Sequence, residues 1–556
     1  MVYLITIFSN SHLMRLRVGR KAIIIAALVS SGAILLSLPF LFNGFGILTI
    51  VALVPVLFLE KYISDNKIKL GWLYIYLTFL LWNTFTTYWI AFANFPGAIG
   101  AIILYSLGIT LVFKGYSWFR QKFNNAIGYA FLVLGLIAFE HLLAEGEIPW
   151  PWLSLGNGFA TSYKVVQWYE YTGVLGGTLW ALLVSISIFS LFSKSFAGCT
   201  VGFRSKIPSF LAIFLVIVPI FISHLMYVSY KEKSDPVNFL IVQPNIDPYH
   251  DKFGGMTQKE QDERLLSLVE EGVTDSTLFV IAPETFSFGI IENEPYSSDS
   301  FKRFAKVVRI HKHVNLIFGA STFYLFPKEQ FSGENRPNYT ARRIDGGWYD
   351  SYNTAVFMDS SGLRMFYHKS KLVPLVEFLP FPKYFGGLKM FYIELGGSMG
   401  NYATQPKRSV YKSHDSSTVI GTAICYESVH GNYYREYILN GATVMSIITN
   451  DGWWLNSPGY TQHLWFDRLR AIETRRSIAR CGNTGVSALI NQRGDIVART
   501  AWWKIEWLRG ELNLNDKITT FVRHGDYIGR VSFASMMLFL CLAILSLLKI
   551  SVKGKK

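Results

Sequence analysis

The sequence is poor in cysteine and in charged residues. Cysteine occurs four times in 556 residues, which excludes a small fold held together by several disulfides. Charged residues make up 16% of the chain, below the ~25% of typical soluble domains. The sequence also has no Walker phosphate-binding loop, no HExxH metal motif and no CxxC pair. We therefore expect neither a cofactor nor a bound metal ion.

Apolar residues are abundant instead, and they form long runs. Hydrophobic residues make up 51% of the chain and aromatic residues 16%. A helix needs about 20 apolar residues to cross a bilayer. About eight runs are this long, at 22–40, 42–60, 70–92, 97–116, 126–145, 174–193, 207–230 and 531–549. The sequence predicts a multi-span helical membrane bundle, with seven spans before a long polar segment and one after it.

Lys and Arg mark alternate loops of this bundle. They gather in residues 15–21, 61–69, 114–122, 194–206 and 549–556. Because short loops rich in these residues stay in the cytoplasm, both termini are expected there and residues 231–529 outside. The first run lacks a small-residue cleavage site and is expected to remain as an anchor. Much of the net charge of +15 then reflects topology, and no nucleic-acid partner is needed to explain it.

The polar segment has the pattern of a separate domain. Strand-like runs at 237–246, 277–286, 314–323, 352–362, 417–427 and 442–451 alternate with amphipathic helical patterns. Such alternation predicts an α/β domain whose sheet is covered by helices. We expect a membrane domain over 1–230, an external domain over 231–529, and a last span with its tail over 530–556.

Three polar residues stand where strands of this domain end. Glu284 ends VIAPET, Lys369 follows FYH, and Cys425 ends TAIC. Each residue alone has an ordinary structural explanation. Glu284 could be a solvated turn residue, Lys369 could keep a sheet edge soluble, and Cys425 could be a small buried hydrophobic residue. Together they fit nucleophilic catalysis, since sites in open α/β sheets gather at the carboxyl ends of strands.

A cysteine nucleophile needs help to lose its proton. A free thiol has a pKa of about 8.5 and is mostly protonated at neutral pH. Glu284 could act as the base if burial raised its pKa, and Lys369 could stabilise the thiolate and an oxyanion. An imidazole from His430 or His463 stays open as an alternative base. A disulfide between Cys425 and Cys481 is a further alternative.

The motifs around these residues resemble a known superfamily. PET, YHKSKLVPLVEFLP and ICYES are similar to the Glu-Lys-Cys triad of the nitrilase or carbon-nitrogen hydrolase superfamily, whose domain is an αββα sandwich. With helical spans on both sides, the chain resembles the apolipoprotein N-acyltransferases of the bacterial inner membrane. The resemblance extends over nearly the whole chain and includes IPWPWLSLGN, VQPNID, TNDGWW and NTGVSALINQRG.

The resemblance implies roles for single residues. Glu284 would be the general base, Cys425 the nucleophile, and Lys369 an oxyanion stabiliser together with the backbone N–H of Tyr426. Glu377 matches a second carboxylate that supports the triad. Strand alternation alone does not separate Lys369 from Lys371, so the choice rests on the YHK part of the motif.

The resemblance also implies the reaction and its place. An acyl chain would pass from a phospholipid to Cys425 as a thioester, and then to the α-amine of diacylglyceryl-cysteine in a lipoprotein, with the catalytic domain in the periplasm. No cofactor is required. Aromatic residues near the motifs could bind the acyl chain or ordinary lipid, although packing explains each equally well: they are Phe253, Phe378, Trp453 and Trp454.

Two other functions remain open. A membrane-tethered amidase could hydrolyse a small amide with the same triad, and it predicts a closed polar pocket. A non-enzymatic scaffold would be expected to lack one of the three triad residues, whereas all three are present.

Overall fold

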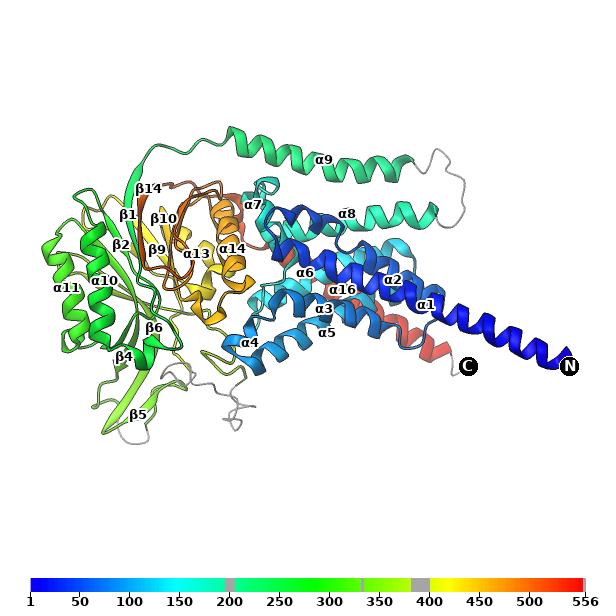
Figure 1. The fold of residues 1–556 in the computed structure, drawn as a ribbon, viewed down its shortest axis with the longest axis horizontal. Helices are drawn as coiled ribbons and strands as arrows, with labels where there is room; N and C mark the ends of the chain where they lie inside the picture. Colours follow the sequence, from blue (N-terminus) through cyan, green and yellow to red (C-terminus); the bar gives the residue numbers. More distant parts are fainter. Residues whose placement is uncertain (1, 196–205, 332–334, 382–400, 554–556) are drawn as a thin grey trace.

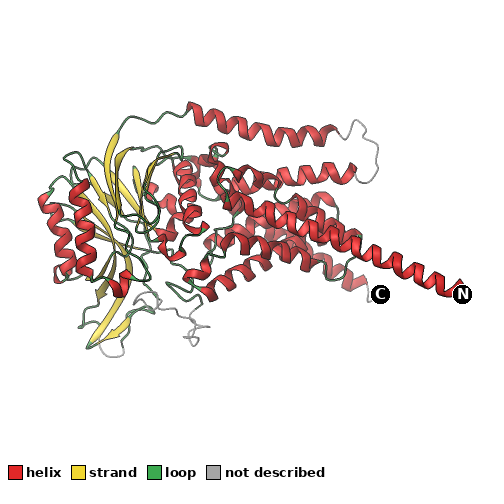
Figure 2. Ribbon diagram, viewed as in Figure 1, coloured by secondary structure: helices red, strands yellow, loops and turns green. Residues whose placement is uncertain are grey.

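The computed structural model describes residues 2–195, 206–331, 335–381 and 401–553 of the chain. Figure 1 shows a helical bundle that carries both ends of the chain and, beside it along the long axis, two stacked sheets. Figure 2 shows the same division, with strands confined to the end opposite the chain termini.

The bundle is built from the first 229 residues and the last helix. Its elements are α1 (Val2–Leu41), η1 (Phe45–Val51), α2 (Val54–Asp65), α3 (Trp72–Thr87), α4 (Ile90–Ala93), α5 (Phe95–Lys122), α6 (Asn125–Glu145), η2 (Leu155–Val165), α7 (Tyr169–Thr172), α8 (Val174–Ser195), α9 (Lys206–Ser229) and α16 (Tyr527–Lys553). Seven segments of the described residues are long and apolar enough to cross a membrane: Gly19–Leu41, Phe45–Asp65, Phe95–Lys122, Asn125–Glu145, Val174–Ser193, Phe210–Ser229 and Tyr527–Leu548. The predicted membrane bundle is therefore confirmed.

The run 70–92 does not form one continuous span as expected. Its main helix, α3, has 16 residues, or about 24 Å of helix, less than the ~30 Å of a hydrocarbon core. The carbonyl of Thr86 accepts hydrogen bonds from Trp89 Nε1 at 3.1 Å and from Gln462 Nε2 at 3.0 Å. Both side chains donate hydrogen bonds to a carbonyl at the end of the helix. Gln462, which belongs to the sheet half, thereby links this end of the helix to the sheets.

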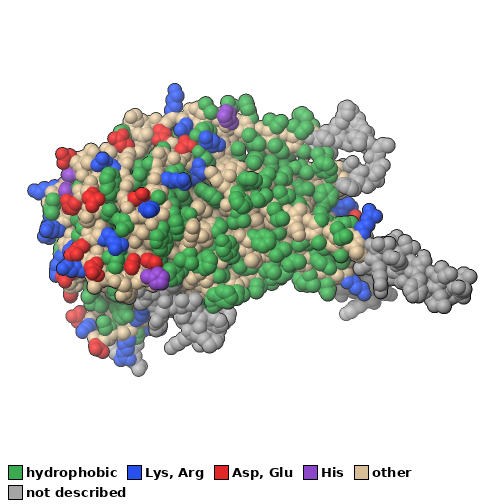
Figure 3. Space-filling view, viewed as in Figure 1, with side chains coloured by type: hydrophobic (Ala, Val, Ile, Leu, Met, Phe, Trp, Pro, Cys, Tyr) green, Lys and Arg blue, Asp and Glu red, His purple; other side chains and the backbone are tan. Residues whose placement is uncertain are grey.

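The surface agrees with a membrane setting. Figure 3 shows hydrophobic side chains covering the bundle, while Lys, Arg, Asp and Glu gather over the sheets and Lys and Arg recur at the far end of the bundle. A wide apolar surface bounded by charge is typical of a membrane-embedded segment.

The other half contains two sheets. In the described residues the first has eight strands, in the order β14-β1-β2-β4-β6-β5 with β3 beside β4 and β7 beside β6, and the second has six, in the order β13-β12-β11-β10-β9-β8. The first comprises β1 (Pro236–Gln243), β2 (Phe279–Ile281), β3 (Ser287–Ile291), β4 (Asn315–Leu325), β5 (Arg342–Ile344), β6 (Gly347–Met358), β7 (Arg364–His368) and β14 (Glu506–Asn513). The second comprises β8 (Val410–Lys412), β9 (Val419–Ile424), β10 (Val444–Thr449), β11 (Ile478–Gly482), β12 (Ala488–Ile490) and β13 (Ile496–Arg499).

Side-chain alternation along β1 explains the layers. Phe239 and Ile241 pack between the two sheets, while Leu240 and Val242 pack on the opposite face. That outer face is covered by α10 (Gln258–Gly272) and α11 (Asp299–Ile310), and α13 (Gly431–Leu439) and α14 (Pro458–Thr474) lie on the side of the second sheet (Figure 1). Both faces of β1 are buried, as in any sheet covered on two sides. The predicted αββα sandwich is confirmed.

Helix α14 joins the two halves. Its residues Phe466, Leu469 and Ile472 belong to the same buried apolar cluster as Trp152 and Tyr163 of the bundle side. The loop after β9, η7 (Cys425–Val429), contributes Tyr426 and Val429 to this cluster. The end of β9 is thereby held against the membrane half.

Candidate active site

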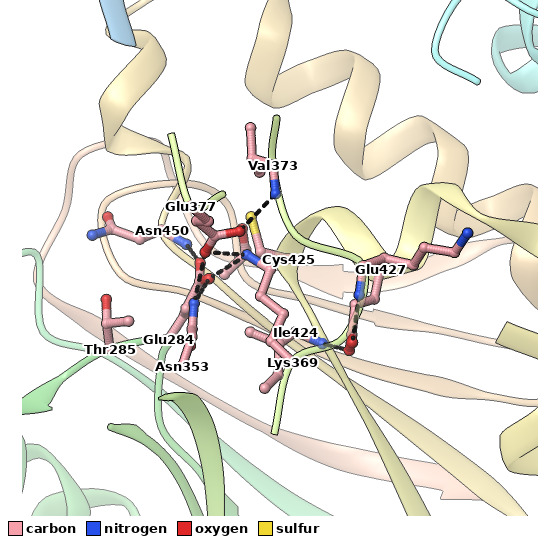
Figure 4. A network of polar contacts seen from close by, with 12 residues as sticks. Glu284, Thr285, Asn353, Lys369, Val373, Glu377, Ile424, Cys425, Glu427 and Asn450 are labelled. Carbon is pink, nitrogen blue, oxygen red and sulfur yellow. Dashed lines mark hydrogen bonds and ion pairs between the residues drawn. The ribbon is translucent and has the colours of Figure 1, made fainter. Parts of the chain in front are cut away.

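The three predicted strand-end residues meet in one place. Glu284 follows β2, Lys369 follows β7 and Cys425 follows β9 (Figure 4). The ammonium of Lys369 donates to Glu284 Oε1 at 3.0 Å. All three side chains are buried, with exposed fractions of 6% for Glu284, 1% for Lys369 and 9% for Cys425. The strands of two different sheets therefore supply one compact cluster.

Glu377 completes the cluster. Lys369 donates to Glu377 Oε1 at 2.9 Å, and the amide of Asn353 donates to Glu284 Oε1 at 2.8 Å and to Glu377 Oε1 at 3.0 Å. Lys371, the alternative lysine, lies 3.8 Å from the carboxylate of Glu145 in α6 and outside this network. We call Glu284, Lys369 and Glu377 the cavity cluster.

The backbone turns sharply at Cys425. Cys425 has φ 51°, and Thr285, directly after Glu284, has φ 45°. Residues other than glycine rarely adopt this left-handed conformation, and such strain gathers at functional sites. Strand β9 ends at Ile424 and η7 starts at Cys425, so the turn lies at their junction.

Glu427, for which the sequence indicates no role, stabilises this turn through hydrogen bonds. Its Oε2 accepts the backbone N–H of Ile424 at 2.8 Å, and its Oε1 accepts the backbone N–H of Ser370 at 2.7 Å. Three tyrosine hydroxyls also donate to this buried carboxylate: Tyr367, Tyr433 and Tyr437. One side chain thus ties the residue before Cys425 to the residue after Lys369.

The charges of the cluster determine the resting protonation states. Burial opposes the charged form of Lys369, but Glu284 and Glu377 raise its pKa well above the usual value. Burial alone would raise the pKa of Glu284, yet the Lys369 charge and the Asn353 hydrogen bond hold it below the ordinary value. The raised pKa that the sequence required as a condition for Glu284 to act as a base is therefore not present in this structure. Burial and the charge of Glu284 raise the pKa of the Cys425 thiol well above its usual value, which favours the protonated form.

A large cavity of about 1060 Å³ opens onto these residues. Its lining includes Cys425, Glu284 and Lys369 together with Ala101 and Leu104 of α5, a candidate membrane span. Other lining residues are mostly apolar: Trp89, Ile90, Pro96, Leu143, Ile148, Pro149, Trp152, Phe286, Val373, Pro374, Leu375, Val376, Leu379 and Phe381. The cavity is therefore built by both halves of the molecule.

Comparisons with known families match this two-part construction. The carbon-nitrogen hydrolase model matches residues 241–520, half of the chain. The chain belongs to the carbon-nitrogen hydrolase family. In addition, the model of the apolipoprotein N-acyltransferase N-terminal domain matches residues 32–187.

Curated relatives are similar over most of this carbon-nitrogen hydrolase. The apolipoprotein N-acyltransferase of Chlorobaculum tepidum is 29% identical, covering 82% of this chain and 84% of the relative. Apolipoprotein N-acyltransferase 1 of Treponema denticola is 24% identical, covering 91% and 92%. Among solved structures, an amidase from Nesterenkonia is 13% identical over 52% of this chain and 94% of that chain, with a TM-score of 0.34.

The predicted lipid-binding aromatics of this carbon-nitrogen hydrolase lie in different places. Trp453 and Trp454 line the cavity. Phe378 is half-buried and is not part of the lining among the described residues. The side chain of Phe253 lies outside the described residues. Sequence reasoning missed Trp89, whose ring centroid is 4.7 Å from that of Trp454.

Lys252 is a second cavity residue that the sequence did not single out. Its ammonium donates to Thr285 Oγ1 at 2.6 Å, and it lines the cavity near Glu284. Burial lowers the pKa of Lys252 to about 8, although Glu284 opposes this shift. The only signal in the sequence was a lysine within the polar DPYHDKF segment.

The two alternatives for Cys425 are not supported. Cys425 and Cys481 are both free, and Cys481 Sγ lies 3.2 Å from the carbonyl oxygen of Val242. His430 Nδ1 lies 3.2 Å from the carbonyl of Ala144. His463 Nε2 lies 3.3 Å from the backbone carbonyl of Cys425 and so approaches its main chain.

Proposed function

We propose that this protein is an apolipoprotein N-acyltransferase. It transfers an acyl chain from a phospholipid to the α-amine of diacylglyceryl-cysteine at the N-terminus of a lipoprotein. The observation that carries the proposal is a buried Glu-Lys-Cys cluster that faces a cavity of about 1060 Å³ lined in part by a candidate membrane span. The comparisons with curated acyltransferases support it.

In the first step, Cys425 Sγ attacks the ester carbonyl carbon while its proton moves to Glu284. The tetrahedral oxyanion is stabilised by the ammonium of Lys369 and the backbone N–H of Tyr426. The C–O bond then breaks, the alcohol oxygen takes the proton from Glu284, and a lysophospholipid leaves. An acyl thioester remains on Cys425.

In the second step, the α-amine of the lipoprotein attacks the thioester carbonyl carbon and gives a proton to Glu284. The C–S bond breaks, an amide forms, and the sulfur takes the proton back as a thiol. The sequence of two half-reactions consumes one ester and one amine and needs no further reactant. The apolar lining excludes water that would otherwise hydrolyse the thioester.

Lys369 suits the oxyanion role because it stays charged. Two carboxylates within 3.0 Å hold its ammonium protonated, and they also fix its position. Glu377 does not face the reacting carbonyl in this scheme; it supports Lys369 and leaves Glu284 as the base.

The amidase alternative fits the cavity less well. A small amide needs few apolar contacts, whereas this cavity is at the upper end of the ~300–1,000 Å³ range of ligand sites. The lining from α5 would also have no purpose in a hydrolase that acts on soluble amides.

We further propose that the protein lies in the bacterial inner membrane with the sheets in the periplasm and both chain ends in the cytoplasm. Lys and Arg at the bundle end that carries the termini support this orientation (Figure 3). The division into 1–230, 231–529 and 530–556 is part of the same proposal.

A transfer assay tests the function. Purified protein is mixed with phosphatidylethanolamine vesicles and a diacylated lipopeptide that has a free α-amine, and the lipopeptide is weighed by mass spectrometry. We expect one added acyl chain with the wild type and with Cys481→Ala, none with Cys425→Ala, and none on an N-acetylated lipopeptide. Hydrolysis of small amides without acylation of the lipopeptide would contradict the proposal and favour the amidase.

A further inference from the structure

A second group of buried charges lies behind the nucleophile and outside the cavity lining. It consists of Asp451, Asp467, Arg480 and His463, which we call the sealed cluster. Their exposed fractions are at most 1%, and none of the four is among the described residues that line the cavity. The reaction scheme above does not use them.

Ion pairs join three members of the sealed cluster. Arg480 Nη2 donates to Asp451 Oδ2 at 2.5 Å, and Arg480 Nη1 donates to Asp467. The guanidinium thereby fixes both carboxylates, and Asp451 in turn contacts the ring of His463.

The partners of the ring nitrogens make Nε2 the donor toward the nucleophile's main chain. His463 Nδ1 lies 3.0 Å from Asp451 Oδ1, an acceptor, and 3.1 Å from Arg480 Nη2, a donor, so its two neighbours leave the protonation of this nitrogen open. On the other side, Nε2 lies 3.3 Å from the Cys425 carbonyl oxygen, also only an acceptor, and 3.0 Å from the Ser428 hydroxyl.

Aromatic rings enclose the imidazole. Trp152 and Trp454 have ring centroids 5.8 Å and 5.5 Å from that of His463. Thr449 donates its hydroxyl to Asp451 Oδ1 at 2.6 Å. The ring is thereby held with Asp451 on its Nδ1 side and the Cys425 carbonyl on its Nε2 side.

We propose that His463 is a positioning residue for acyl transfer that polarises the Cys425–Tyr426 peptide unit through a hydrogen bond from Nε2 to the Cys425 carbonyl. The Cys425 carbonyl and the Tyr426 N–H belong to one peptide, so a hydrogen bond accepted at the oxygen strengthens the N–H as a donor. That N–H is the backbone donor to the oxyanion in the scheme above. The same contact holds Cys425 in its left-handed turn. This inference rests on the proposed acyl transfer.

Two nearly isosteric substitutions separate the two ring nitrogens. Glutamine places its amide nitrogen near the position of Nε2, and asparagine places its amide nitrogen near Nδ1. Removing an oxyanion donor costs about 10²–10³ in kcat. For His463→Asn we expect at least a tenfold lower rate of acyl-thioester formation at saturating phospholipid with KM unchanged. For His463→Gln we expect a rate within about threefold of the wild type.

Equal losses in both variants, or no loss in His463→Asn, would overturn the inference. A measurement on the wild-type protein keeps the inference testable if a variant does not fold. In ¹⁵N-histidine-labelled protein, we expect Nε2 of His463 to carry a proton that is hydrogen-bonded to the Cys425 carbonyl, whereas an Nε2 without a proton would overturn the inference. Failure of the wild type to form a thioester would instead refute the proposed function, and the nitrogen spectrum would still test the hydrogen bonds.

Discussion

The cavity cluster and the sealed cluster contain the same kinds of charged groups but lie in different surroundings. Each places one cation between two buried carboxylates: Lys369 between Glu284 and Glu377, and Arg480 between Asp451 and Asp467. The first lines the cavity with a thiol beside it, and the second is closed off beneath the main chain of that thiol. The two clusters therefore differ in access: a substrate in the cavity can reach the cavity cluster, whereas the sealed cluster can act only through the residues packed against it.

The choice of cation fits each setting. Lysine offers a single compact charge that two carboxylates can share, and it leaves room for an oxyanion at the same ammonium. Arginine offers a planar fork that holds two carboxylates in fixed positions. We therefore expect substitutions in the cavity cluster to affect chemistry, and substitution of Arg480 in the sealed cluster to affect stability.

The largest effect is expected for Glu284→Gln, which removes the base of the cavity cluster and keeps its shape. Positioned bases contribute about 10²–10⁴ in rate, so we expect thioester formation to slow at least a thousandfold while the unfolding temperature changes little. The exposed Glu294 of the same segment provides a matched control as Glu294→Gln. A rate near that of the wild type would show that another group accepts the thiol proton.

Arg480→Met tests the sealed cluster. It leaves two buried carboxylates without their cation, and breaking a buried pair in this way costs roughly 3–5 kcal/mol. We expect a large fall in the unfolding temperature and in the yield of folded protein. The exposed Arg499 serves as the control as Arg499→Met. An unchanged unfolding temperature together with lost activity would reverse the assignment of the two clusters.

The comparison also applies to the two buried thiols. Burial and Glu284 raise the pKa of Cys425 well above 9.0, so little thiolate is present at pH 7. We expect alkylation of Cys425 by iodoacetamide to be slow at pH 7 and about tenfold faster for each unit as pH rises toward that pKa. Cys481 is fully buried and should stay unlabelled until the protein unfolds.

Peptide mapping by mass spectrometry distinguishes the two cysteines. In Glu284→Gln the labelling of Cys425 should be faster than in the wild type, because a negative charge that raises its pKa is gone. Fast labelling of wild-type Cys425 at pH 7 would mean that the resting nucleophile is a thiolate.

The smallest effect concerns Lys252. Its pKa is lowered to about 8 by burial, so the charged form is less favourable in the folded than in the unfolded protein. This cost is fully present below pH 8 and disappears as pH rises from 8 toward 10.5, the ordinary lysine value. Lys252→Met should therefore unfold a few degrees above the wild type at pH 7, and the difference should shrink above pH 8 in thermal scans. A difference that does not change with pH would refute the buried charge as its cause.

Sequence patterns located the cavity cluster but not its surroundings. Glu284, Lys369 and Cys425 could be predicted because strand-end chemistry and short motifs mark them. The contacts of Glu427 with Ser370 and of His463 with Arg480 could not be predicted, since these partners are distant in sequence and meet only in the folded protein; the sequence offered His463 only as an alternative base. The same holds for Trp89, which lies in a run of apolar residues and meets Trp454 across the two halves.

The fold was predictable where periodicity is strong. The membrane bundle follows from runs of apolar residues and the α/β domain from their alternation with polar ones, whereas the αββα arrangement of two sheets was implied by the resemblance to the nitrilase superfamily. The break after α3 is a tertiary effect, because Gln462 of α14 donates to the carbonyl of Thr86. The lowered pKa of Glu284 is likewise a tertiary effect: burial alone predicts a rise, and the charges that reverse it come from other strands.

The most direct test of the proposed chemistry is the mass of the intact protein after incubation with phospholipid vesicles and no amine acceptor. We predict one added acyl chain on the wild type, located on Cys425, released by hydroxylamine, and passed on when a diacylated lipopeptide with a free α-amine is supplied. A protein that transfers the chain without ever carrying it on Cys425, or an adduct that the lipopeptide amine never removes, would contradict the account.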